Sequence, residues 1–155
     1  MLAISRAVPQ DAEGILALQK LAYQSEAKLY NDWSLPPLTQ SLESLLEEFA
    51  SSVILKAMSG GRIVGAVRAK VASGTCTIGR LAVHPDFQGQ GIGSELLKNI
   101  EASFPDASKY ELFTGSRSQA NIRLYQRHGY TISRTQAVSP TVSLTFLEKP
   151  ANPAP

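Results

Sequence analysis

The sequence predicts a single mixed α/β domain, with a mostly antiparallel central sheet of about six or seven strands and about four flanking helices. Apolar residues switch between helical spacing and short β-type runs along the 155 residues. Three consecutive β-type runs are joined only by short turns, which indicates hairpins and argues against a uniformly parallel, doubly wound sheet. We expect the domain to cover residues 1–149, and the proline-containing tail 150–155 to be disordered.

The first half of the chain begins with a predicted strand at residues 2–8. Pro9 suits the first position of a helix, whose apolar face extends as far as Leu29, and residues 29–37 read as a loop. Thr39 is expected to cap a second helix. The apolar face of this second helix comprises Leu42, Leu45, Leu46 and Phe49.

The remaining elements follow from alternation, turn residues and helical spacing. The expected strands are 53–58, 62–71, 75–83, 110–114, 130–138 and 141–147. The expected helices are 92–104 and 119–128, and Gly129 is a typical C-terminal cap of the latter.

Composition limits the classes of function. The chain is 43% hydrophobic and 18% charged, which is ordinary for a globular protein. A formal net charge of +2 gives no reason to expect nucleic acid. The single cysteine, Cys76, excludes an internal disulfide, fits a reducing compartment and is expected to be a small buried hydrophobe. No apolar run is long enough for a membrane span, so we expect no membrane partner and a cytoplasmic location.

Residues 78–97 carry the most informative pattern. The apolar run 81–83 reads as a buried strand that must end at Pro85, because proline has no N–H for a ladder. A glycine-rich turn at residues 88–93 and an amphipathic helix follow. The first-turn N–H groups of this helix have no intrahelical partners, so they form an anion site suited to phosphate.

Two common phosphate-binding motifs do not fit this turn. A dinucleotide-binding loop needs G-x-G-x-x-G, but Ser94 stands at the last glycine position and no acidic residue follows at the required distance. A P-loop needs Gly-Lys-Ser/Thr, whereas Gly93 is followed by Ser94 and Glu95.

The turn instead resembles the acetyl-CoA site of the GNAT family of N-acetyltransferases, whose signature is Q/R-x-x-G-x-G/A. Gln88, Gly91 and Gly93 fill the three positions of this signature. The resemblance is specific over residues 78–130, and elsewhere it extends to the order of elements. It implies a GNAT-like fold, acetyl-CoA as the acyl-donor substrate and no metal.

The resemblance also implies roles for individual residues. The Val83 N–H would face the thioester oxygen, Asn121 would contact CoA, and the Tyr125 hydroxyl would reach the sulfur and return a proton to the departing thiolate. Tyr125 also reads as a core residue, and Asn121 as a helix cap. The residues implied to bind CoA are Leu81, Val83, Gln88, Gly89, Gln90, Gly91, Ile92, Gly93, Ser94, Asn121 and Tyr125.

The general base is left open. Many members of the family carry a glutamate on the strand before the glycine turn, but residues 75–80 contain no carboxylate. The alternatives are water and five side chains from the first two helices, their loop and the strand exit: Glu26, Asp32, Glu43, Glu47 and His84.

Five other side chains have either two possible interpretations or a single expected role. Arg80 indicates either an anionic group on the substrate or a structural salt bridge. Tyr23, Tyr30 and Trp33 either wall an acceptor pocket or pack as core aromatics. His128, beside a helix cap, is expected to face solvent.

The function expected from the resemblance is acetyl-CoA-dependent transfer of an acetyl group to a primary amine, by direct attack in a ternary complex. The acceptor is a small-molecule amine or a protein amine, and the residues do not choose between them. The preferred acyl length is also open, and a homodimer would be typical of similar proteins. The alternative from another class is a non-catalytic module that binds acyl-CoA and regulates a partner.

Overall fold

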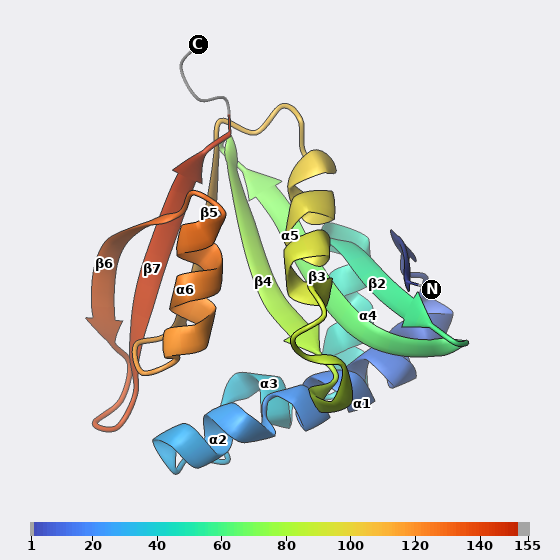
Figure 1. Cartoon of the computed structure of the whole chain (residues 1–155), viewed down its shortest axis with the longest axis horizontal. Coiled ribbons are helices and arrows are strands. Elements are labelled where there is room, and N and C mark those ends of the chain that lie inside the picture. The colour runs from blue at the N-terminus through green and yellow to red at the C-terminus, as the bar shows by residue number, and fades with distance from the viewer. Residues whose placement is uncertain (1, 152–155) are drawn as a thin grey trace.

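A computed structural model describes residues 2–151 and contains one seven-stranded sheet, in the order β1-β2-β3-β4-β5-β7-β6 (Figure 1). The β4–β5 pair is parallel and the five other neighbouring pairs are antiparallel. The strands are β1 (Leu2–Arg6), β2 (Val53–Ser59), β3 (Arg62–Ala72), β4 (Thr75–Val83), β5 (Lys109–Gly115), β6 (Thr131–Ala137) and β7 (Ser143–Pro150). The predicted mixed, mostly antiparallel sheet is confirmed.

Helices cover both faces of the sheet. α1 and α4 share one apolar cluster with β2 and β3, and α5 and α6 contribute to the larger cluster on the other face. The helices are α1 (Ala12–Ala22), α2 (Gln24–Tyr30), α3 (Pro36–Thr39), α4 (Leu42–Ser51), α5 (Ile92–Ala102) and α6 (Gln119–Arg127). Two single 3₁₀ turns occupy Pro9–Asp11 and Pro85–Phe87.

The helical region before β2 differs from the prediction. The first helix breaks at Tyr23, which ends α1 and precedes α2, and α2 and α3 occupy the two ends of the predicted loop. Pro36 opens α3, where its fixed φ suits a first helical position. Thr39 is the last residue of α3 and does not cap α4. The cap is Ser41, whose hydroxyl accepts a hydrogen bond from the Ser44 N–H at 3.1 Å.

The C-terminal boundary of the domain also differs from the prediction. Pro150 was expected to begin the disordered tail, but it is the last residue of β7 and pairs with Lys109 of β5. The Ala151 N–H donates to the Ser108 carbonyl at 3.1 Å. Residues 152–155 of the predicted tail lie outside the described residues.

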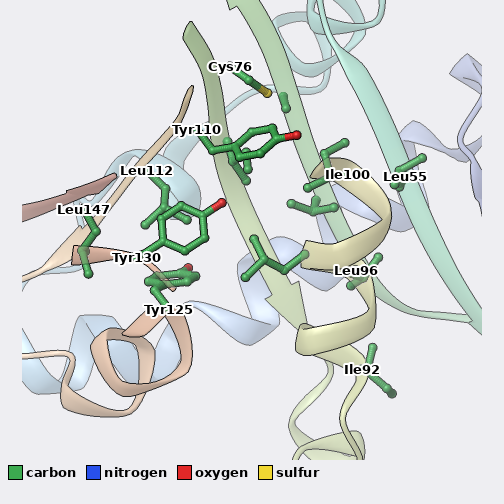
Figure 2. Packing of buried hydrophobic residues seen from close by; sticks show 14 of the residues in the cluster. Leu55, Cys76, Ile92, Leu96, Ile100, Tyr110, Leu112, Tyr125, Tyr130 and Leu147 are labelled. Carbon is green, nitrogen blue, oxygen red and sulfur yellow. The ribbon is translucent and has the colours of Figure 1, made fainter. Parts of the chain in front are cut away.

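The larger core cluster lies between the sheet and α5, and its aromatic members reach across to β5 and α6 (Figure 2). Leu96, Leu97 and Ile100 of α5 are fully buried. Cys76 is also fully buried, and burial raises the pKa of its thiol to about 11, so it remains a neutral apolar side chain. The expectation for Cys76 is confirmed.

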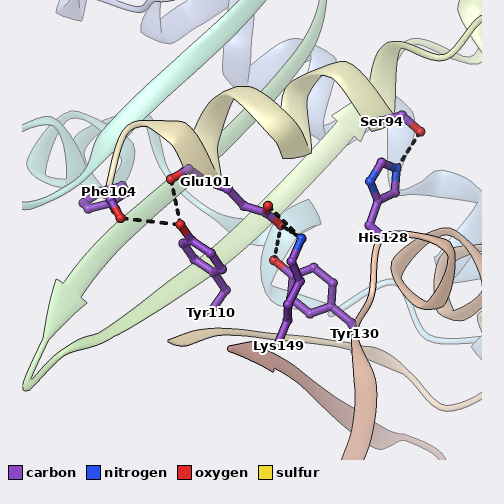
Figure 3. A network of polar contacts seen from close by, with 7 residues as sticks. All are labelled: Ser94, Glu101, Phe104, Tyr110, His128, Tyr130 and Lys149. Carbon is purple, nitrogen blue, oxygen red and sulfur yellow. Dashed lines mark hydrogen bonds and ion pairs between the residues drawn. The ribbon is translucent and has the colours of Figure 1, made fainter. Parts of the chain in front are cut away.

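A polar network ties α5 to the second half of the sheet (Figure 3). The Glu101 carboxylate accepts hydrogen bonds from Tyr130 Oη at 2.7 Å and Lys149 Nζ at 2.9 Å. Tyr110 Oη donates to the Glu101 backbone carbonyl at 3.0 Å. These contacts fix α5 relative to β5 and β7, and therefore fix where its N-terminus lies.

The centre of the sheet opens on one side. β4 and β5 pair only over Thr75–Thr77 and Lys109–Glu111, and beyond these residues the two strands diverge (Figure 1). The diverging end of β4 leads into the glycine turn and α5. A ligand can therefore reach backbone groups of β4 that a continuous sheet would have paired.

Candidate active site

A β-bulge shapes the open end of β4. Ala66 pairs with Ala82 and Arg68 with Gly79, so Arg80 and Leu81 together oppose a single residue of β3, Val67. Arg80 has a φ of +53°, in the left-handed region that non-glycine residues seldom adopt. A two-against-one arrangement of this kind bends the strand and redirects its side chains.

The backbone of β4 beyond the bulge presents polar groups away from β3. Val83 and Gly65 form a non-hydrogen-bonded pair, because the His84 N–H donates to the Val64 carbonyl at 2.8 Å. The Val83 N–H therefore points toward the β5 side, where the sheet is open. The Leu81 carbonyl accepts a hydrogen bond from Tyr23 Oη at 3.1 Å and keeps a second lone pair.

The N-terminus of α5 carries unpartnered amides. Gly91, at the N-cap position, has a φ of +81° and no side chain with which to cap the helix. The first intrahelical bond runs from the Glu95 N–H to the Gly91 carbonyl at 3.0 Å. The N–H groups of Ile92, Gly93 and Ser94 thus lie at the positive end of an 11-residue helix, an arrangement suited to an anion.

These features border one cleft of about 310 Å³, which lies between β4, α5, α6 and the α1–α2 junction. Its volume is at the lower end of the range for small-molecule sites. Two predicted residues, Gln90 and Tyr125, are not among those that line it. The predicted residues that do line it are Leu81, Val83, Gln88, Gly89, Gly91, Ile92, Gly93, Ser94 and Asn121. Arg127 adds a positive charge to the wall.

Tyr125 does not line the cleft and belongs to the larger core cluster. Its side chain is only 6% exposed, and its ring packs against that of Tyr130 with centroids 6.2 Å apart (Figure 2). Burial raises the pKa of Tyr125, and the nearby Tyr23 and Glu26 raise it further. Both of these neighbours line the cleft. The phenol is therefore protonated at neutral pH and lies close to the cleft.

A hydrogen-bonded cluster joins α2 to α6 at the cleft. Glu26 accepts hydrogen bonds from Ser118 Oγ at 2.5 Å and from Asn121 Nδ2 at 3.3 Å. Asn121 Nδ2 also lies 3.3 Å from Thr114 Oγ1. Ser118, not Asn121, is the N-cap residue of α6, so the cap interpretation of Asn121 is wrong.

Glu26 is the carboxylate among the predicted base candidates that lines the cleft. Asp32 accepts hydrogen bonds from the backbone and side chain of Ser34, and Glu43 and Glu47 are exposed on α4. His84 does not line the cleft. Its Nδ1 accepts from the Asp86 N–H at 3.1 Å, and its Nε2 lies 3.4 Å from an Arg62 nitrogen.

The predicted aromatics divide between the two readings. Tyr23 lines the cleft, and burial raises the pKa of its phenol to about 12. Tyr30 is buried, and its Oη accepts from the Arg117 N–H at 2.7 Å, which anchors α2 to the loop before α6. Trp33 is 55% exposed and lines no part of the cleft.

The expectation that His128 faces solvent is wrong. Its Nε2 lies 2.9 Å from Ser94 Oγ in the first turn of α5, so it links the two helices that border the cleft (Figure 3). Burial lowers the pKa of His128, which favours the neutral imidazole.

Sequence reasoning missed two polar residues beside this site. Ser118 holds Glu26 at the cleft, and the signal that could have found it is its place at the start of the predicted helix 119–128. Burial and the positive charge of Arg80 lower the pKa of Arg68, so the two arginines lie close together. The signal that could have found Arg68 is a single arginine inside the otherwise apolar run 63–69.

Comparison with known proteins identifies the family. A model described as the acetyltransferase (GNAT) family matches residues 15–130. The chain therefore belongs to the GNAT family of acyl-CoA N-acyltransferases.

None of the described helices is long and apolar enough to cross a membrane. The described residues also include no cluster of three or more His, Cys, Asp or Glu arranged to hold a metal ion.

One of the curated relatives is named as an N-acyltransferase. L-amino acid N-acyltransferase MnaT from Escherichia coli is 35% identical over 66 residues, which are 41% of this chain and 37% of that protein. The chain spans only 36% to 46% of the length of the curated relatives it matches.

Solved structures support the fold. A ribosomal-protein alanine N-acetyltransferase from Escherichia coli superposes with a TM-score of 0.82 at 17% identity, covering 100% of this chain and 97% of the other. The PaiA N-acetyltransferase from Thermoplasma acidophilum, in complex with coenzyme A, gives 0.79 at 15% identity, covering 97% and 99%.

Proposed function

We propose that this protein is an acetyl-CoA-dependent N-acetyltransferase that moves an acetyl group to a primary amine by direct attack in a ternary complex. The acceptor is a small-molecule amine or a protein amine. The observation that carries the proposal is the cleft itself, where the uncapped N-terminus of α5 and the free edge of β4 border the same space.

The proposed residues divide the reaction between them. The α5 amides and the glycine turn hold the pyrophosphate, and the edge of β4 holds the pantetheine arm. The amine nitrogen attacks the thioester carbon, so a C–N bond forms and the C–S bond breaks. The Val83 N–H stabilises the negative charge on the carbonyl oxygen, and Tyr125 Oη gives a proton to the departing thiolate.

Glu26 is the proposed base. An ammonium with a pKa near 10.4 is only about 0.04% neutral at pH 7, so removing its proton is part of the task. Glu26 lines the cleft and is held by Ser118 and Asn121. In this role it accepts the ammonium proton through a water molecule.

The first test measures binding of acetyl-CoA by thermal unfolding. Ligand at about 100 times its Kd adds roughly 2.7 kcal/mol to the free energy of unfolding, which for a domain of this size raises Tm by about 5–11 °C. Turnover is then followed by thiol release with a panel of amines. No rise in Tm at millimolar acetyl-CoA would refute the cleft as an acetyl-CoA site.

Two glycines make a matched pair for this test. Gly91 at the cleft (φ +81°) and Gly61 in the β2–β3 turn (φ +78°) are both left-handed, and a Cβ added at either would lie in open space. Alanine therefore strains both backbones alike. Only Gly91→Ala places a methyl group beside the anion site, so it should weaken acetyl-CoA binding at least about tenfold, as expected from loss of one charge-assisted hydrogen bond. Equal affinity in the two variants would contradict the assignment.

A further inference from the structure

Two arginines lie together on the face of the sheet that α1 and α4 cover. Arg68 of β3 and Arg80 of β4 border the same cavity of about 10 Å³, room for one water molecule, along with Gln19 of α1 and Leu45 of α4. Both arginines are only partly buried, so a larger group would bind them from their exposed side. Each is close enough to the other for its charge to matter, since Arg80 lowers the pKa of Arg68. Burial lowers the pKa of both, although guanidinium groups remain charged.

The β4 bulge is what places Arg80 there. Cys76 and Ile78 belong to the core cluster on the α5 face, and regular alternation would put Arg80 on that face too. The left-handed conformation of Arg80 interrupts the alternation, and its side chain instead reaches the α1 face beside Arg68. The strain of this conformation falls on a charged residue beside the open end of the sheet, and strained residues of this kind cluster at functional positions.

The charge of the pair is not neutralised. Within the described part of the chain, neither guanidinium forms an ion pair with a carboxylate. Glu48 is the acidic group that faces both arginines, but its carboxylate accepts a hydrogen bond from Ser52 Oγ at 2.8 Å. Arg68 has a long contact of 3.5 Å to Gln40 Oε1.

Arg80 also has an unused donor. Its Nη1 is buried and has no hydrogen-bond partner among the described residues. A buried donor on an unpaired charge is costly, so it calls for a partner such as a ligand, an ion or a water molecule. The structural salt bridge considered from the sequence is therefore not present among these residues.

The pair is linked to the cleft through Tyr23. Arg80 immediately precedes Leu81, whose carbonyl accepts a hydrogen bond from Tyr23 Oη. Burial raises the pKa of Tyr23, and the charges of both arginines oppose that rise. Tyr23 lines the cleft. Tyr23 therefore connects the arginine pair to the cleft that Val83 lines.

We propose that Arg68 and Arg80 bind the carboxylate of the acetyl acceptor, which makes the acceptor a free amino acid. A guanidinium presents its N–H groups in a planar fork that matches a carboxylate, and two of them give both affinity and orientation. This inference rests on the proposed acetyltransferase function and narrows its acceptor. It sets polyamines and internal protein lysines aside, because they have no carboxylate next to the reacting amine.

The test compares amino acids with their carboxamides as acceptors. The full-length protein is assayed by thiol release with the twenty amino acids and the corresponding amides. The ratio of kcat/KM for acid over amide should be roughly 10- to 150-fold, the range expected for hydrogen bonds to a charged group. In Arg80→Gln and Arg68→Gln this ratio should fall close to one, while kcat/KM for the amides and the Kd of acetyl-CoA stay within about threefold of wild type.

Arg134→Gln is the matched control. Arg134 is on the exposed strand β6, where its guanidinium stacks on Phe146 at 3.9 Å from the ring centroid. It should leave the acid-to-amide ratio unchanged. Arg80→Gln should not lower Tm, because it removes a buried charge that has no partner.

Calorimetry gives a readout that does not need turnover. N-acetyl amino acids and their amides are titrated into the protein saturated with CoA. Tighter binding of the acids, lost in Arg80→Gln, supports the proposal even where no tested amine reacts. Equal binding or turnover of acids and amides in the wild type would overturn the proposal. A parallel loss of acid and amide binding in the variants would also overturn it, because it would indicate that the two arginines form a structural pair bridged by water. Absence of acetyl-CoA binding would instead refute the proposed function.

Discussion

Replacing Tyr125 by phenylalanine tests the proposed proton donor with little effect on folding. The side chain is buried and packs on Tyr130, and phenylalanine keeps that contact. No hydrogen bond from Tyr125 Oη to another described residue is present, so the substitution removes no partner within that part of the chain. We expect the free energy of unfolding to change by less than about 0.5 kcal/mol, and Tm by less than about 2 °C.

The expected kinetic effect is much larger. Burial keeps the Tyr125 phenol protonated at assay pH, so nearly every molecule carries the proton to be transferred. General acid catalysis typically contributes about 10²–10⁴ in rate, or roughly 2.7–5.5 kcal/mol. Turnover should therefore fall by that factor, while the Kd of acetyl-CoA changes by less than about fivefold, the value of one ordinary hydrogen bond.

Tyr110→Phe is the control, because it should lower stability and leave turnover unchanged, the reverse of what Tyr125→Phe should do. Tyr110 is equally buried, but its Oη donates to the Glu101 carbonyl at the closed end of the sheet (Figure 3). Loss of this bond should cost about 1 kcal/mol of stability and leave turnover unchanged. Thiol-release kinetics, acetyl-CoA titration and thermal unfolding on the two variants give all of the required numbers.

A Tyr125→Phe enzyme within threefold of wild-type turnover would refute the assignment of this phenol. A wild-type protein that binds acetyl-CoA but acetylates no amine would instead favour the acyl-CoA-binding regulatory module. The two results are distinct, because the first requires measurable turnover and the second its absence.

Two further substitutions test the base and the packing under α5. Glu26→Gln should lower kcat/KM about 10²–10⁴-fold, whereas Asp32→Asn should leave kcat/KM unchanged. A wild-type kcat/KM in Glu26→Gln would exclude Glu26 as the base. Gly65→Ala should lower the free energy of unfolding by about 1–3 kcal/mol, because the new Cβ would lie 2.8 Å from Leu96 Cδ1 and 3.0 Å from Ile92 Cγ2. Denaturant unfolding measures this loss, and Leu96→Val should recover part of it if overpacking is the cause.

The glycine turn could be predicted because the constraints that define it are local. Gly91 must be left-handed and free of a side chain, Pro85 must end the strand, and the spacing of the next helix is visible in its apolar residues. The class of sheet could be predicted for the same reason, since the hairpins around β3 are set by turns of a few residues.

The early helices were harder to read, because their boundaries depend on contacts with distant parts of the chain. Tyr23 interrupts the predicted first helix and bonds to Leu81, 58 positions later. Tyr30 remains helical and bonds to the backbone of Arg117. Neither contact leaves a pattern in the neighbouring sequence.

The sequence alone predicted the central strand–turn–helix, the family and most of the residues that line the cleft. The tertiary structure decided which carboxylate faces the cleft and where the arginines lie. Glu26 is selected because Ser118 and Asn121 hold it there, and Arg80 reaches Arg68 because a bulge reverses its side of the sheet. Both outcomes come from long-range packing and strand register, which local propensity and spacing do not encode.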